Sequence, residues 1–414
     1  DADYRTYGDT ITAWSDLSRT VLHPDQVRAL LQKWNKALPA QTRLETIGMS
    51  HERRPIVAMA ISTGPQSSWQ TKRSVFLNGA HHGNEPMSVS FVLDAAQRIL
   101  EGLRKNEAFA TRALEHTVLW IVPVVNPDGL HRFLEVSSHL GRKNGRDHGP
   151  IKGPDRVDGV DLNRNYPFRW GALGNRGSKP WKSSVYYRGP AAASEPEVQS
   201  IMALARRERF DWALTYHSGT IALLYCYTID GVKNPRPNPN EQSAARLIDG
   251  LPEHPQGKPW AIRSNLYAVD GTDQDWHYHT HGTLALLVEG ARSTPRNAKR
   301  RRNLLDAVWP IAERLFDGTG LPTSLELSIL NDTGPADNVY ITVDNVTVAG
   351  ERWTPRARDG RLHVWLPTSG ETTVRVYRDE ALLMRTSFHV PATGLRRVIR
   401  LPDAPQEPAE GSGP

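Results

Sequence analysis

The sequence predicts an α/β protein with a mixed central sheet flanked by helices, followed by a small β-sandwich. Short apolar runs alternate with helical patterns over the first 320 residues, as they do in a sheet covered by helices. After residue 320 the pattern changes to short segments of alternating polarity separated by turn residues, which is typical of a sandwich. We therefore expect a first domain over residues 1–320, a β-sandwich domain over 321–403 and a disordered Pro/Gly/Glu-rich tail over 404–414.

The first half of the chain gives clear signals for its elements. Val27, Leu30 and Leu31 recur at helical spacing, which favours an amphipathic helix. Pro86 suits the first position of a helix, and it closely follows an apolar run. In chain order we expect a helix from Pro24, a hairpin over 42–62, a strand over 74–80, a helix from Pro86, a strand over 118–125 ending at the turn 126–129, and long loops over 136–190.

The second half continues the alternation and then changes to strands alone. Ser194 and Glu197 are spaced as a capping box, which predicts a helix that runs to about Arg209. We then expect strands over 211–217 and 283–289 and a helix over 297–316. The predicted strands of the sandwich are 324–330, 339–343, 361–366, 372–377, 383–388 and 397–401.

Composition excludes several classes of protein. The net charge of +6 arises from 51 basic and 45 acidic residues that are mixed along the chain, and no aromatic residues interleave with the densest basic run at 299–302, so we expect no nucleic-acid partner. No apolar run approaches the ~18 residues of a membrane span. The single Cys226 predicts a buried small hydrophobe and no intrachain disulfide. The chain begins at Asp1 rather than Met, so we expect a processed or trimmed amino terminus; a removed signal peptide, together with the resemblance given below, would indicate a secreted or periplasmic protein, and we expect a monomer.

The strongest functional signal is His82-Gly-Asn-Glu85, followed by His217 in Thr-Tyr-His-Ser-Gly. Two histidines and a carboxylate are suitable zinc ligands, and three protein ligands leave a fourth position open for catalysis. His82 has the three-residue spacing to Glu85, whereas the adjacent His81 does not. Because His82 follows a predicted buried strand, we expect the ligands at the carboxyl end of the sheet.

Further polar residues suit a hydrolytic site. Asn163 and Arg164 place an amide and a guanidinium in one loop, where they could grip a carboxylate. Glu289 closes an apolar strand, and a carboxylate there is costly unless it has a partner or a function. We interpret Asp158 and Asp161 as residues that brace the loop. The alternating His277, His279 and His281 are interpreted as strand or loop residues and not as a second metal centre.

Taken together, residues 20–318 resemble the zinc metallocarboxypeptidases of the carboxypeptidase A/B family. The motifs that carry the resemblance occur in the family's order and near its spacings. They are His82-x-x-Glu85, Asn126-Pro-Asp-Gly129, Gly141-Arg142, Gly159-Val-Asp-Leu-Asn-Arg-Asn165, Tyr187-Arg-Gly-Pro190, Ser194-Glu-Pro-Glu197, His217-Ser218, and Tyr267, Asp275-Trp276 and Glu289.

The resemblance implies a zinc-dependent hydrolase that removes C-terminal residues from peptides or proteins. By motif position, His82, Glu85 and His217 would bind one zinc ion per chain. Glu289 would be the general base and later the proton donor. Arg142 would polarise the carbonyl group of the bond that is cleaved.

The resemblance also implies a substrate-binding set. Asn163 and Arg164 would bind the terminal carboxylate, and Tyr267 would cover the bound substrate. Thr228 and Gln274, together with Thr272, would form the floor of the side-chain pocket. None of these three is charged, but Asp230, Asp270 and Asp273 are near in sequence, and an inward-pointing one would favour Lys or Arg.

Two branches of the family are represented in the chain. The chain resembles the regulatory carboxypeptidase N/E branch, which carries a transthyretin-like domain, in Gln274-Asp275, in the Gly219 that directly follows His217-Ser218, and in the added β-domain. The segment Tyr187–Pro190 instead resembles the digestive branch. Digestive members have an arginine where Asn84 stands, so one substrate contact differs. The alternative functions are a zinc amidohydrolase, acting on cell-wall peptides or N-acyl amino acids, and an inactive carboxypeptidase-like binding protein.

Overall fold

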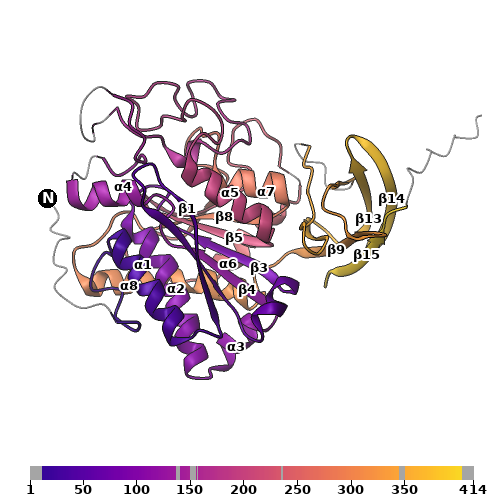
Figure 1. Cartoon of the computed structure of the whole chain (residues 1–414), viewed down its shortest axis with the longest axis horizontal. Helices are drawn as coiled ribbons and strands as arrows, with labels where there is room; N and C mark the ends of the chain where they lie inside the picture. The colour runs from indigo at the N-terminus through magenta and orange to yellow at the C-terminus, as the bar shows by residue number, and fades with distance from the viewer. Residues whose placement is uncertain are drawn as a thin grey trace, which may run out of the picture.

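An eight-stranded mixed sheet forms the centre of the larger part of the molecule (Figure 1). The computed structural model describes residues 12–136, 140–149, 155, 157–234, 236–344 and 350–402. The strand order is β1-β2-β4-β3-β5-β8-β6-β7, in which β4, β3, β5 and β8 are mutually parallel neighbours. The strands are β1 (Thr42–Met49), β2 (Pro55–Ile61), β3 (Arg73–Asn78), β4 (Thr117–Val122), β5 (Trp212–His217), β6 (Ile221–Tyr225), β7 (Ala261–Arg263) and β8 (Leu284–Gly290).

Helices cover both faces of this sheet, because its strands are apolar on both sides. One face buries a hydrophobic cluster shared with α1, α2, α3, α6 and α8, and the other buries a cluster shared with α5 and α7. The helices are α1 (Pro24–Ala37), α2 (Pro86–Arg104), α3 (Ala108–Glu115), α4 (Pro127–His131), α5 (Pro196–Glu208), α6 (Pro239–Ile248), α7 (Asp273–His281) and α8 (Ala298–Phe316), with short helical turns η1 (Gln66–Thr71), η2 (Arg132–Val136) and η3 (Leu162–Arg164).

The predicted hairpin, the strands before His82 and Glu289, and the helices from Pro24 and Pro86 are confirmed. The capping box is wrong: helix α5 forms, but its N-cap is Glu195, which makes no capping bond because its carboxylate binds distant side chains. The strand over 118–125 ends at Val122, and the turn expected at 126–129 is the start of α4, capped by Asn126.

The three alternating histidines were placed in the wrong element. His277, His279 and His281 lie on α7, a helix that the sequence pattern did not predict because it is polar on most sides. The rings of His277 and His281 lie 6.5 Å apart between centroids, but the three histidines are not among the clusters that could hold a metal within the described residues. Cys226 is fully buried and free, as predicted.

Two small antiparallel-rich sheets follow α8. One contains β10 (Gly334–Pro335), β9 (Thr323–Asn331), β12 (Arg361–Leu366) and β15 (Leu395–Arg400), and the other contains β11 (Tyr340–Val343), β13 (Gly370–Arg378) and β14 (Ala381–Val390). Every predicted strand in this region is present, and the strands enclose a hydrophobic cluster of their own. The expected tail lies outside the described residues.

Asp211, which directly precedes β5, connects the C-terminal strands to the larger sheet. Its carboxylate forms ion pairs with Arg356 (3.1 Å) and His363 (3.2 Å), and its carbonyl oxygen accepts a hydrogen bond from Trp365 Nε1 (2.8 Å).

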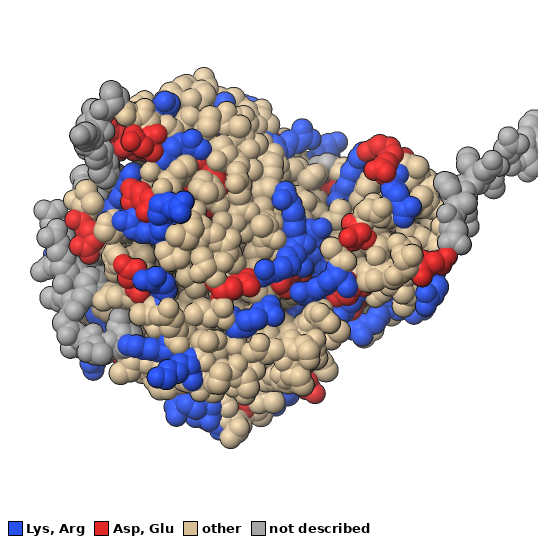
Figure 2. All heavy atoms as spheres, in the orientation of Figure 1, with Lys and Arg blue, Asp and Glu red and all other residues tan. Residues whose placement is uncertain are grey.

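Positive and negative side chains stand next to one another over much of the face in Figure 2. None of the helices in the described ranges has the length and apolar character needed to cross a membrane.

Candidate metal centre and active site

The three predicted metal ligands meet at one edge of the central sheet. His82 and Glu85 lie on the short connection from β3 to α2, and His217 is the last residue of β5. Since β3 and β5 are parallel neighbours, their carboxyl ends lie side by side. Gly83 lets this connection pack closely against α4, because a Cβ there would lie 2.0 Å from Leu130 N.

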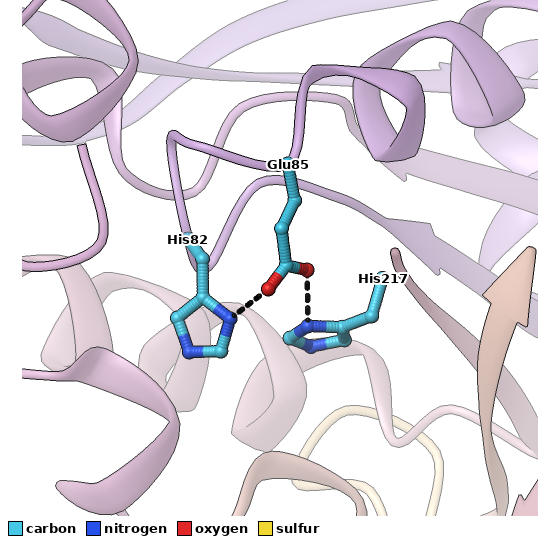
Figure 3. A group of neighbouring side chains, drawn as sticks. All are labelled: His82, Glu85 and His217. Atoms are coloured by element: carbon cyan, nitrogen blue, oxygen red, sulfur yellow. Dashed lines mark hydrogen bonds and ion pairs between the residues drawn. The ribbon is translucent and has the colours of Figure 1, made fainter. Parts of the chain in front are cut away.

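The side chains of the three ligands converge (Figure 3). Glu85 Oε1 lies 2.7 Å from His82 Nδ1, and Glu85 Oε2 lies 2.9 Å from His217 Nδ1. All three residues are buried, and their donor atoms lie within 4.8 Å of one another. Burial alone would raise the pKa of Glu85, but the two imidazoles outweigh it and hold that pKa well below its ordinary value.

The tautomer of His82 shows that this donor set fits a metal cation. Its Nε2 lies 3.0 Å from Asp161 Oδ1, and a carboxylate can only accept, so Nε2 carries the proton. In a neutral ring Nδ1 of His82 then presents a lone pair toward a Glu85 oxygen 2.7 Å away, and a metal cation there would take the place of the second proton that an imidazolium carries. Two imidazoles and one carboxylate are a suitable set for zinc.

Asp161 was interpreted as a loop-bracing residue, and it also supports the site. Its carboxylate accepts from the backbone of Asn163 (3.1 Å), from His82, and from Arg142 Nε (3.0 Å) and Nη2 (2.7 Å). Burial would raise the pKa of Asp161, but Arg142, then His82 and Arg164, hold it well below its ordinary value. Such outer carboxylates orient metal-binding histidines. Sequence spacing gave no signal for its contact with His82.

His81 is not one of the converging ligands, although its ring stacks on that of His217 at a centroid distance of 5.8 Å. It is fully buried, its Nε2 lies 2.9 Å from the hydroxyl of Tyr166, and it does not line the pocket described next. Burial lowers the pKa of His81 to about 3, so that the ring is neutral.

One pocket of about 380 Å³ brings all ten predicted site residues together. Glu289, at the end of β8, stands opposite His217 in the parallel register of β5 and β8. The predicted residues that line the pocket are His82, Glu85, Arg142, Asn163, Arg164, His217, Thr228, Tyr267, Gln274 and Glu289.

Glu289 combines a buried carboxylate oxygen with a raised pKa. Its Oε2 is inaccessible to solvent and has no hydrogen-bond partner among the residues that the structure describes. Burial, and then repulsion by Glu85, raise the pKa of Glu289 to about 7, while His217 opposes the shift. A carboxyl group that titrates near neutral pH can both accept and deliver a proton.

Two arginines in the pocket differ in their partners. Arg142 is paired with Asp161, as described above. Arg164 is 3% exposed and donates to the carbonyl of Asn163 (2.6 Å) and to the hydroxyl of Tyr267 (3.2 Å), but it forms no ion pair within the described ranges. Tyr267 is half exposed, on a loop beside the pocket.

Tyr186 is a residue that the sequence analysis missed. Its ring centroid lies 4.9 Å from the guanidinium carbon of Arg142 and 5.9 Å from that of Arg164. An aromatic face stabilises a cation at these distances. The residue lies directly before the Tyr187–Pro190 motif, and nothing in its sequence context indicates a contact with either arginine.

The floor of the pocket rests on a buried carboxylate. Asp275 accepts from the Thr228 backbone (2.8 Å) and hydroxyl (2.9 Å), and from the backbone of Ile229 (3.2 Å). Burial raises the pKa of Asp275 to about 6, against these donors, so that the group is ionised at pH 7.

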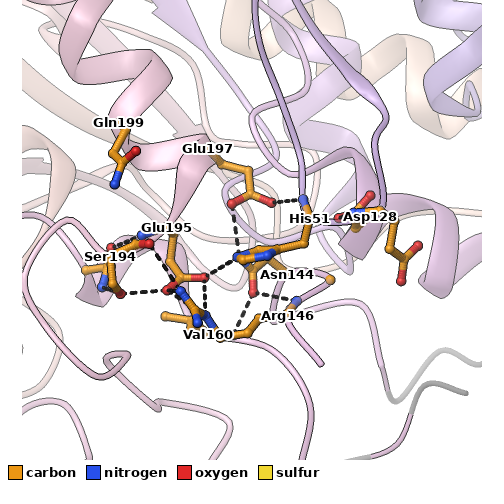
Figure 4. A network of polar contacts seen from close by, with 12 residues as sticks. His51, Asp128, Asn144, Arg146, Val160, Ser194, Glu195, Glu197 and Gln199 are labelled. Atoms are coloured by element: carbon orange, nitrogen blue, oxygen red, sulfur yellow. Dashed lines mark hydrogen bonds and ion pairs between the residues drawn. The ribbon is translucent and has the colours of Figure 1, made fainter. Parts of the chain in front are cut away.

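A second histidine–carboxylate group lies outside the pocket (Figure 4). His51, Glu195 and Glu197 also bring their donor atoms within 4.8 Å of one another. We call them the closed cluster. Asn144 bridges its two carboxylates, and Arg146 donates to Glu195.

The chain is similar in sequence to known zinc carboxypeptidases. A family model described as zinc carboxypeptidase matches residues 27–296. Zinc carboxypeptidase A 1 of Anopheles gambiae is 28% identical over 262 residues, or 61% of this chain and 56% of the relative. Metallocarboxypeptidase A of Arthroderma otae is 29% identical over 289 residues, or 67% and 65%. The matches thus span 56–65% of the length of these relatives.

Solved structures share the fold. Thrombin activatable fibrinolysis inhibitor superposes with a TM-score of 0.68 at 19% identity, over 77% of this chain and 79% of that one. Carboxypeptidase A of Helicoverpa armigera gives 0.64 at 22% identity, over 77% of each chain. These similarities confirm the predicted central mixed sheet flanked by helices.

Proposed function

The chain belongs to the zinc carboxypeptidase family, and on that premise we propose that it hydrolyses the last peptide bond of peptides or proteins. Arg164 is the observation that carries the proposal. It is a buried cation with no carboxylate partner in the described part of the chain, and it lines the same pocket as the metal ligand set. Because an unpaired buried charge is costly, Arg164 favours an anionic ligand, and the carboxylate of a peptide end provides one.

We propose His82, Glu85 and His217 as the zinc ligands, in keeping with the tautomer argument. A bound zinc would supply a water of lowered pKa and a Lewis acid for the carbonyl oxygen. Glu289 is proposed as the group that accepts the water's proton and delivers it to the leaving amine. Its position opposite His217 and its pKa of about 7 support this role.

Arg142 is proposed to stabilise negative charge that develops on the carbonyl oxygen. Its Nε and Nη2 are held by Asp161, which fixes the plane of the guanidinium and leaves Nη1, 3.9 Å from Glu85 Oε1, on the side of the metal ligands. A fixed donor at the reacting bond needs no reorganisation when the charge forms.

Asn163 and Arg164 are proposed to bind the terminal carboxylate and Tyr267 to cover it. The hydroxyl of Tyr267 already contacts Arg164, and the exposed loop position of Tyr267 would let a substrate enter beneath the ring. Thr228 and Gln274 are proposed to contact the terminal side chain.

A blocked dipeptide and its C-terminal amide test the proposal. The amide should be cleaved at least about 100-fold less efficiently, because it leaves the Arg164 guanidinium without its anionic partner. Arg164→Lys should also lose activity although its charge is kept, since an ammonium cannot form the planar pair. Arg263→Lys is the control, because Arg263 also donates to a neighbouring carbonyl but lies outside the pocket. Equal kcat/KM for acid and amide would exclude a carboxypeptidase.

We further propose that residues 321–403 form a separate β-sandwich domain, which their own hydrophobic cluster supports. A fragment with these residues should give a dispersed amide NMR spectrum, and a collapsed spectrum would contradict the proposal. A secreted or periplasmic location and a monomeric state stay predictions.

A further inference from the structure

The pocket offers the terminal side chain of a substrate an apolar wall without charge. Leu224 and Leu287 pair across strands β6 and β8 and line it, together with Leu266 and Val269. The remaining lining residues away from the metal ligands include the uncharged Thr228, Thr272 and Gln274, each at most 2% exposed. An apolar wall around a few buried polar groups is the usual design of a selective pocket.

The three aspartates that could have given the pocket a negative floor all face elsewhere. Asp270 accepts from the backbone nitrogens of Leu173 and Ser178, both at 3.0 Å. Asp273 is bound to the Thr215 hydroxyl and to His277. Asp230 is exposed and binds Asn265 (2.6 Å). None of the three lines the pocket, and Asp275 beneath the floor already accepts from Thr228 and Ile229, so a Lys or Arg side chain would be buried there without a free carboxylate at its end.

The hydrogen bonds at the floor fix the orientation of the Gln274 amide. The Thr228 hydroxyl has one proton, which it donates to Asp275, so its oxygen can only accept from other neighbours. Gln274 Nε2 lies 3.4 Å from that oxygen, and Thr272 Oγ1 lies 3.3 Å from it. The amide NH₂ of Gln274 therefore faces Thr228, and the hydroxyl proton of Thr272 is also directed there.

This arrangement leaves one acceptor without a donor. Gln274 Oε1 is buried and has no hydrogen-bond partner among the described residues. The neighbouring donors, the Gln274 NH₂ and the Thr272 hydroxyl, are already directed to Thr228, whereas no donor is directed to this carbonyl oxygen. A ligand that brings a donor would satisfy it, and a ligand of the same shape without a donor would leave it unsatisfied.

We propose that the pocket selects a C-terminal side chain that is apolar along its length, uncharged, and ends in a hydrogen-bond donor that Gln274 Oε1 accepts. Tyrosine is such a residue. This inference rests on the proposed carboxypeptidase function and specifies its substrate class. A neutral hydrogen bond made to an otherwise unsatisfied acceptor corresponds to about tenfold in kcat/KM.

Matched blocked dipeptides test the inference, with Tyr, Phe, Lys or Arg as the terminal residue. The intact protein should prefer Tyr over Phe by about tenfold, and Lys and Arg should be poorer than Phe. Gln274→Leu should abolish the Tyr preference, bringing the Tyr/Phe ratio of kcat/KM to about one. Gln274→Glu should raise cleavage of Lys and Arg relative to Tyr, because it puts a carboxylate at the position of the free oxygen.

Gln97→Leu is the matched control. Gln97 lies on α2, outside the pocket, and also has an amide oxygen without a partner, so the same substitution should leave the Tyr/Phe ratio unchanged. A wild-type preference for Lys or Arg, or equal rates for Tyr and Phe, would overturn the inference while the proposed function stands. Failure to cleave any of the four free-acid peptides would instead overturn the proposed function.

Discussion

The candidate metal centre and the closed cluster contain the same kinds of residue at similar distances, yet their hydrogen-bond partners differ. In the metal centre, Glu85 faces two imidazole nitrogens and one backbone N–H, that of Ser218 (3.0 Å). Its ligand atoms border an open pocket. A neutral His82 with its proton on Nε2 turns the electron pair of Nδ1 toward Glu85, an arrangement that suits a cation.

In the closed cluster, the carboxylates are already supplied with donors. Glu195 accepts from His51 Nε2 (2.9 Å), Asn144 Nδ2 (2.8 Å), Arg146 Nε (3.0 Å) and the Ser194 hydroxyl (2.6 Å). Burial would raise the pKa of Glu195, but these donors lower it to about 2. A metal ion would have to displace them and would be repelled by the guanidinium of Arg146.

The difference shows that residue type and distance do not suffice to identify a metal site. What matters is whether the lone pairs are free and whether the site can be reached. The closed cluster joins α5 to the hairpin of β1 and β2 and to the loop of Asn144, which indicates a structural role. The predictions below use matched substitutions to break each cluster in turn.

We expect the largest effect from a comparison in which one histidine of each cluster is replaced by alanine in separate variants. His82→Ala, alone or with Glu85→Ala, should abolish stoichiometric zinc and reduce peptide hydrolysis to the background of the assay, because two ligands or fewer remain. His51→Ala should keep one zinc per chain. Elemental analysis after dialysis against a weak chelator measures both. If His51→Ala does not fold, His51→Gln keeps a donor and serves in its place. Zinc that follows His51 instead of His82 would reverse the assignment.

The second-largest effect should distinguish the role of Glu289 as the base from the role of the metal ligands. Glu289→Gln preserves the shape of the side chain but cannot accept a proton, so kcat should fall by about 10²- to 10⁴-fold. Zinc content and Tm should be unchanged, since the substitution removes no ligand. Steady-state kinetics and metal analysis on the same sample give the result. A variant that retains more than about a tenth of the wild-type kcat would exclude Glu289 as the base.

Removing a carboxylate from the closed cluster should affect stability rather than chemistry. Glu195→Ala removes the carboxylate that pairs with Arg146, whose side chain is 26% exposed, and one of the two carboxylates that Asn144 bridges, so we expect a loss of about 1–3 kcal/mol. Urea unfolding followed by fluorescence measures the loss, while kcat per folded molecule should stay within about twofold. A loss of less than about 1 kcal/mol, or a loss of zinc, would contradict the structural role.

Much of the fold could be predicted because its elements have apolar faces with a regular period. The strands before His82 and Glu289 are continuous apolar runs, and C-terminal strands such as β9 and β13 alternate polar and apolar residues over much of their length. Helix α7 was missed because it is buried through polar and aromatic residues such as Asp273 and Trp276, whose partners are distant in sequence. The α5 capping box was wrong because tertiary contacts of Glu195 replaced the local bond.

The site residues could be proposed from sequence because they lie in short motifs. The sequence could not show which groups support them, since these contacts join distant segments. Asp161 contacts His82 across 79 residues, and Tyr186 stacks on Arg142 from another loop. The orientation of Asp230, Asp270 and Asp273 was left open for the same reason, and only the folded loops exclude them from the pocket.

The smallest effect concerns the pH dependence of the closed cluster. Burial raises the pKa of Glu197 to about 7, and Asp128 adds to the shift, while His51 and Asn144 oppose it. The folded protein therefore holds a proton that the unfolded chain releases above its ordinary pKa of 4.5. The contribution of Glu197 to the free energy of unfolding is therefore greatest below pH 4.5, and it falls by on the order of 1–3 kcal/mol as the pH rises to about 7.

Glu197→Gln should remove this slope, because the amide does not titrate. Urea unfolding of both proteins at pH 5, 6, 7 and 8 gives the difference between them, which cancels contributions from other buried carboxyls such as Glu289. The pKa of His51 is also raised, since Glu195 and Glu197 outweigh the effect of burial, so its contribution has the same sign and is reduced but not removed in the variant. Wild type should lose stability relative to Glu197→Gln between pH 5 and 7 and run parallel to it above pH 8. Parallel curves over the whole range would mean that Glu197 is ionised in the folded protein, and the closed cluster would then hold two full negative charges balanced by Arg146 and a charged His51.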